Sequence, residues 1–142
     1  SNIGAVKSPE YPERDWVETP GLGLRSILGK RDSSEIRSEF YDHRNEFSEL
    51  YARAHTLENN GDAEGLKEFL SDPETRKKVG LAPEVDKVAR QLAVLSKQIE
   101  LVRNNPKLTS AVKEERIRAF KKNQNETAKR AEIAIRQALS AP

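Results

Sequence analysis

The sequence predicts an all-α fold: an elongated antiparallel three-helix bundle with a short-helix connector and an extended N-terminal arm. Three segments carry apolar residues that alternate at spacings of three and four, the period of one helix face. Hydrophobic residues (35%) and charged residues (34%) are almost equally frequent, which suits long two-sided helices better than a thick globular core. Three such stripes are expected to bury one another at shallow crossing angles.

Residues 1–31 are predicted to form the arm, and residues 32–142 the helical domain. The arm is rich in Pro and Gly, which break regular elements. Its stretch PGLGLRSILGKRD is reminiscent of a phosphate-binding loop, but five rather than four residues separate Gly23 from Gly29, and Arg31 stands where a magnesium-binding Ser or Thr belongs. We therefore expect glycine hinges leading into a helix, and no nucleotide site.

The first long helix is predicted to begin at a capping box, because Asp32 is followed three positions later by Glu35. Its apolar stripe includes Phe40 and Phe47 and ends before Asn59-Asn60-Gly61, a sequence typical of a left-handed helix stop. A helix of about 27 residues would be about 40 Å long.

The connector is predicted to contain two short helices. Asp62 can cap the first, and Asp72-Pro73 supplies a cap and a first-turn proline for the second, which we expect to end at Gly80.

Two further long helices are predicted to form an antiparallel hairpin. The first should start near Pro83 and end at Asn104-Asn105-Pro106, since the proline forbids continuation. Thr109 or Ser110 caps the second, and the short connection places the two helices side by side.

The residue types that support catalysis are scarce. The chain has no cysteine, which excludes disulfides, thiolate metal sites and cysteine nucleophiles. His43 lies on an apolar stripe and is interpreted as a hydrogen-bonded core histidine, while the acidic ridge on the same helix is interpreted as a solvated face; this ridge consists of Glu39, Asp42, Glu46 and Glu49. Neither His43 nor His55 has the Glu three positions earlier that di-iron bundles use. We predict no catalytic residue, metal, cofactor or small-molecule ligand.

Charge is unevenly distributed along the chain. Residues 32–75 carry twelve acidic and four basic side chains, and residues 76–142 carry seven acidic and sixteen basic ones. One hypothesis is a nucleic-acid face on the last two helices, formed by Lys113, Arg116, Lys121, Lys122, Lys129 and Arg130. The other is an acidic helix packed beside two basic ones. Acid-to-base pairs at four-residue spacing favour the latter: Glu49–Arg53, Asp86–Arg90, Glu114–Arg118, Glu126–Arg130 and Glu132–Arg136.

Residues 20–139 resemble the large polyvalent protein-associated domain number thirty-eight. The likeness lies in PGLGLRSILGKRD, in SSEIRSEFYDHRNEF, and in a hairpin whose turn has the form Asn-Pro-x-Leu-Thr/Ser before a Lys/Glu/Arg-rich helix. Such domains lie near the C-terminus of giant proteins of bacteriophages and other mobile elements. The resemblance implies no catalytic residue, and implies a location in the virion or in the bacterial host cytoplasm.

These observations together predict a non-enzymatic structural or interaction module at the C-terminal end of an internal virion or ejection protein. Its partners would be other phage virion proteins or a second copy of itself, contacted through apolar and aromatic residues of the arm: Tyr11, Trp16, Leu22, Leu24, Ile27 and Leu28. The alternatives are a DNA-contacting basic helical module and a regulatory appendage of an upstream enzymatic domain. No membrane span is expected, because the uncharged stretches are far shorter than the roughly 18 residues required.

Overall fold

The computed structural model describes residues 28–142, and this part of the chain contains four α-helices and no strand. The helices are α3 (Ser33–Asn59), α4 (Ala63–Phe69), α5 (Pro73–Arg103) and α6 (Ser110–Ser140). The predicted all-α class is confirmed over this range. Residues 1–27, which make up most of the predicted arm, lie outside the described part.

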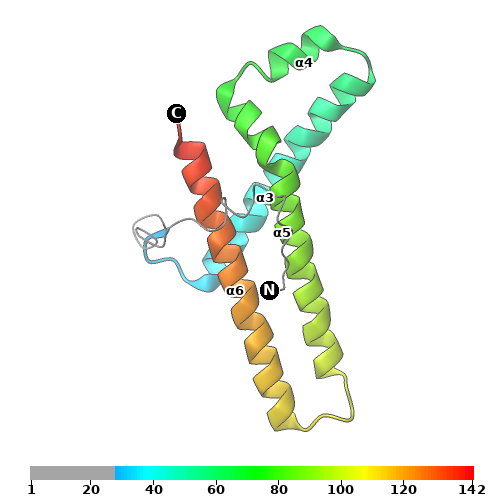
Figure 1. Cartoon of the computed structure of the whole chain (residues 1–142), viewed down its shortest axis with the longest axis vertical. Coiled ribbons are helices and arrows are strands. Elements are labelled where there is room, and N and C mark those ends of the chain that lie inside the picture. The colour runs from blue at the N-terminus through cyan, green and yellow to red at the C-terminus, as the bar shows by residue number, and fades with distance from the viewer. Residues whose placement is uncertain (1–27) are drawn as a thin grey trace, which may run out of the picture.

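Helix α3 crosses the pair formed by α5 and α6 instead of following it from end to end. Figure 1 shows α5 and α6 side by side and joined by the loop at residues 104–109, with α3 passing across them. Each of these three helices contacts the other two, and α4 contacts α3. The end of the α5–α6 pair next to the loop therefore extends beyond α3 (Figure 1).

The main hydrophobic core lies at this crossing. Phe40 and Phe47 of α3 are completely buried, as predicted, whereas Phe69 and Phe120 are only partly buried. In α6 every buried residue falls between Ala128 and Ile135. The core cluster combines residues from all three long helices: Phe40, Phe47, Ala82, Val85, Val88, Ala89, Leu92, Ala128, Ala131 and Ile135.

Most helix ends form as the sequence predicts. The Asp32 side chain accepts a hydrogen bond from the Glu35 backbone N–H at 2.8 Å, and the Glu35 carboxylate accepts one from the Asp32 backbone N–H at 3.0 Å. Gly61 follows the end of α3 with a φ of 73°, the left-handed conformation that glycine adopts without strain. Asp62 and Thr109 cap α4 and α6 through hydrogen bonds from Gly65 and Val112, respectively.

The predicted break between Gly80 and Pro83 is wrong, because α5 runs without interruption from Pro73 to Arg103. A proline inside a helix removes one backbone hydrogen bond and costs about 3 kcal/mol. Ala82 and Val85, on either side of Pro83, are buried in the core. We infer that this burial offsets the local penalty and keeps the two predicted segments in one helix.

Candidate functional site

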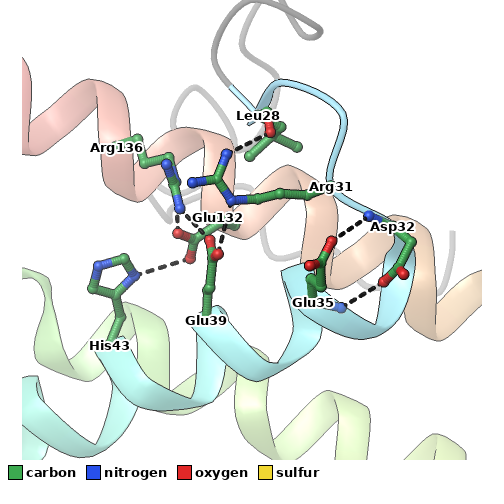
Figure 2. Close-up of polar contacts among 8 residues, drawn as sticks. All are labelled: Leu28, Arg31, Asp32, Glu35, Glu39, His43, Glu132 and Arg136. Carbon is green, nitrogen blue, oxygen red and sulfur yellow. Dashed lines mark hydrogen bonds and ion pairs between the residues drawn. The ribbon is translucent and has the colours of Figure 1, made fainter.

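A polar cluster built around one buried carboxylate connects the first described residues with α3 and α6, as Figure 2 shows. At its centre is Glu132 of α6, whose side chain has an exposed fraction of 0%. Its Oε2 atom accepts a hydrogen bond from Arg136 Nε at 2.8 Å, and its Oε1 atom lies 3.0 Å from His43 Nδ1. Since buried charges require partners, these contacts explain how a carboxylate is tolerated inside the protein.

The second carboxylate of the cluster, Glu39, extends the network to the segment before α3. Arg136 also donates to Glu39, and Arg31 Nε donates to Glu39 at 2.7 Å. The Glu39 carboxylate raises the pKa of the Arg31 guanidinium above its ordinary value. Arg31 in turn donates to the Leu28 carbonyl at 2.7 Å, so that residues 28–31 are held against the helical domain.

This anchoring corrects the prediction that Leu28 is a partner contact. Leu28 is only 2% exposed and packs against Ile36 and Ile133, in a second apolar cluster beside the polar one. Gly29, with a φ of 68°, makes the turn that returns the chain to the start of α3. The other predicted arm contacts lie outside the described residues: Tyr11, Trp16, Leu22, Leu24 and Ile27.

The polar cluster has the contacts of a structural network. A general acid or base has to reach its substrate within hydrogen-bond distance. Both Glu132 oxygens already have partners, and the side chain is shielded from solvent. His43 is hydrogen-bonded at the edge of the core, as predicted, so the arrangement joins α3 to α6 and leaves no space for a substrate at Glu132.

The burial of Glu132 was missed from the sequence, which predicted a solvated Glu132–Arg136 pair. One signal was available: Glu132 lies within the run Ala131-Glu-Ile-Ala-Ile135, where every neighbour is apolar. The periodicity of a single apolar face would not have revealed this burial, because Ile133 and Ile135 lie in different apolar clusters, on different sides of the helix.

The acidic ridge of α3 supplies partners for basic residues of other helices. Arg44 of α3 donates to Asp86 of α5 at 2.9 Å, and Lys78 of α5 lies 2.6 Å from Glu46 of α3. The pairs Lys78–Glu46 and Arg136–Glu39 each join an acidic residue of α3 to a basic residue of another helix, as the hypothesis of an acidic helix beside basic ones expects. The pair Arg44–Asp86 has the opposite polarity.

The predicted four-residue pairs divide into two groups. Asp86–Arg90 and Glu132–Arg136 form, at 3.0 Å and 2.8 Å. The remaining pairs are absent from the ion pairs of residues 28–142: Glu49–Arg53, Glu114–Arg118 and Glu126–Arg130. Arg53 instead places its guanidinium 5.4 Å from the centre of the Phe69 ring.

Six basic residues between positions 116 and 130 of α6 are exposed, and we call them the α6 basic face: Arg116, Arg118, Lys121, Lys122, Lys129 and Arg130. Among the described residues none of the six has a hydrogen-bond or ion-pair partner. Lys113, which the sequence assigned to the same surface, instead donates to the Arg103 carbonyl at 2.9 Å and stabilises the end of α5.

Two open grooves border the α6 basic face. The first has a volume of about 700 Å³ and is lined by Ser33, Glu114, Ile117, Arg118, Lys121, Lys122, Asn125, Glu126 and Lys129. The second has a volume of about 330 Å³ and is lined by Arg37, Tyr41, Leu92, Ser96, Lys121 and Gln124. Lys121 lines both grooves, and Arg37 of the second donates a hydrogen bond to Asn125 of the first.

No group of three or more His, Asp or Glu residues within residues 28–142 is arranged to hold a metal ion. None of α3 to α6 combines the length and the hydropathy that a bilayer span requires.

No protein-family model, curated protein or solved structure matches the chain. The family resemblance drawn from the sequence therefore stays a prediction.

Proposed function

We propose that the chain is a non-enzymatic helical interaction module, built as a three-helix bundle with antiparallel α5 and α6. The observation that carries this proposal is an apolar pair on the outer surface of α5. Val94 and Leu101 have exposed fractions of 57% and 63%, and their seven-residue spacing places them on one helix face. We infer that a protein partner covers these two side chains, because that contact would remove their apolar surface from water.

The family resemblance supplies a biological setting for this proposal. It favours a terminal module of a large bacteriophage or mobile-element protein, in the virion or in the host cytoplasm. Its partners would be other virion proteins or a second copy of the chain, with the arm residues before Leu28 as additional contacts. A regulatory appendage of an upstream enzymatic domain remains the alternative setting.

The double variant Val94→Ser/Leu101→Ser tests the α5 surface. If the partner is a second copy, light scattering should give a mass that rises with concentration for the wild type and stays monomeric for the variant. If the partner is another protein, it should copurify in stoichiometric amount with the wild type and not with the variant. Ala93→Ser, on an exposed position of the same helix, is the control. A wild type that is monomeric and has no stoichiometric partner contradicts the proposal.

A second candidate function is polyanion contact through the α6 basic face. It is favoured by the absence of ion-pair partners for this face in the described part, because unpaired cations are free to neutralise phosphates. Titration with a short DNA duplex at two salt concentrations tests it. The candidate is supported if the logarithm of the binding constant falls linearly with the logarithm of the salt concentration, with a slope of about −0.9 per phosphate contact. Absence of binding at low salt contradicts it.

A further inference from the structure

An exposed aromatic ring of α3 lies beside the α6 basic face. Proteins that hold single-stranded nucleic acids combine a basic groove for the backbone with aromatic side chains on which bases stack. The sequence places Tyr41 far from the basic residues of α6. The fold, however, brings Tyr41 into the same groove as Lys121, together with Arg37.

The Tyr41 ring is accessible and has a fixed support. Tyr41 is 39% exposed, and its ring forms a T-shaped pair with the Phe40 ring at a centroid separation of 5.3 Å and an interplanar angle of 73°. Phe40 is fully buried in the core. Since one edge contact with a buried ring limits the motion of Tyr41, the exposed surface of the ring is suited to stacking.

The cations needed for the backbone continue along α6 from the same place. Lys121 joins the Tyr41 groove to the larger one, where Arg118, Lys122 and Lys129 provide three more positive charges. Positions 118 to 129 span about 16 Å along the helix axis. Glu114 and Glu126 also line the larger groove, so four cations face two carboxylates and the balance is positive.

We propose that the two grooves form one site for a single-stranded nucleic acid, in which a base stacks on Tyr41 and adjacent phosphates contact Lys121, Lys122 and Lys129. The proposal rests on the polyanion contact suggested above for the α6 basic face. A duplex would contact the same cations, but its bases are stacked inside the helix and cannot cover Tyr41.

The test is a fluorescence-anisotropy titration of the full chain with labelled oligo-dT, oligo-rU and a duplex of equal length, at low and high salt. Tyr41→Ala should weaken binding of the single strands by roughly tenfold or more, because one stacked base is lost. It should leave duplex binding unchanged. Tyr41→Phe keeps the stacking ring and should bind like the wild type.

Two control variants distinguish a failure of the proposed stacking site from a failure of the polyanion contact. Tyr51→Ala removes another exposed tyrosine of α3, with an exposed fraction of 37%, and should not affect binding. Lys121→Gln/Lys122→Gln should weaken binding of every nucleic acid. If this double variant loses binding but Tyr41→Ala binds single strands like the wild type, the stacking site is overturned and the polyanion contact stands. If the wild type binds no nucleic acid at low salt, both are overturned.

Discussion

The C-terminal part of α6 and the part before it each contain an acid-to-base pair at the same spacing, but only the C-terminal pair forms an ion pair. Glu132–Arg136 and Glu126–Arg130 are both acid-to-base pairs at four-residue spacing. The first forms at 2.8 Å around a fully buried carboxylate, and the second is absent from the ion pairs of the described residues. The difference is α3, which brings Glu39 to Arg136 and His43 to Glu132, whereas neither Glu126 nor Arg130 has a polar partner among the described residues. Four-residue spacing permits an ion pair, but exclusion of water and additional partners decide whether it is formed and fixed.

The same comparison explains where positive charge accumulates. At the crossing, the carboxylates Glu39, Glu46 and Asp86 pair with basic residues of neighbouring helices. The six residues of the α6 basic face have no such carboxylate partner among the described residues, and they stay exposed. The surplus positive charge is therefore carried by residues of α6 that no neighbouring carboxylate pairs with.

The largest expected effect comes from the core at the crossing. Phe47→Ala should lower the free energy of unfolding by about 3 to 5 kcal/mol, because the fully buried ring leaves a cavity. Phe120→Ala, outside the crossing and only partly buried, should cost clearly less. Urea denaturation followed by circular dichroism measures both. Equal losses would show that the core extends along the whole helix pair.

The ion pair at the crossing is the next strongest contribution. Arg136→Met should cost about 3 kcal/mol, because it leaves the buried Glu132 charge with His43 as its remaining contact. Glu132→Gln should cost less, since Arg136 is partly exposed and keeps Glu39. Arg130→Met is the control, because Arg130 belongs to the Glu126–Arg130 pair, which does not form. Urea denaturation gives the free energy of unfolding of all three variants. A loss from Arg130→Met as large as that from Arg136→Met would contradict the comparison.

A smaller and pH-dependent effect is expected at Lys78. Its hydrogen bond to Glu46 raises the pKa of Lys78 above its ordinary value of 10.5. Because the folded pKa is raised, the stabilisation is fully present below about pH 10.5 and is lost as the pH rises through the folded pKa. Lys78→Met should thus cost up to about 1 kcal/mol at pH 8 and less at pH 11 or above. Urea denaturation at both pH values measures this cost. If the cost is the same at both, the packing of the aliphatic part of Lys78, and not its charge, is responsible.

The smallest effect on stability is expected on the α6 basic face. Arg118→Gln/Lys122→Gln should change the free energy of unfolding by less than about 0.5 kcal/mol, since neither side chain has a polar partner among the described residues. Thermal unfolding at low and high salt provides the measurement. A marked destabilisation would mean that these cations serve the fold and are not available to a ligand.

Local chemistry in the sequence determined where most helices begin and end. The capping box at Asp32 and Glu35, the stop at Gly61 and the cap at Thr109 each involve residues a few positions apart, so they could be predicted before any packing was known. The all-helical class followed from the same periodicity. His43 could be predicted as a hydrogen-bonded residue, although its partner Glu132 could not.

Only the tertiary structure decided how these helices pack against one another and which of their residues become buried. It keeps α5 continuous through Pro83, buries Glu132 and Leu28, and places Tyr41 beside Lys121. The physical reason is that caps and periodicity act over a few residues, whereas burial and ion pairing depend on which distant surfaces exclude water together. In this protein the angle at which α3 crosses α5 and α6 sets those surfaces, and a helix's own sequence does not specify the angle.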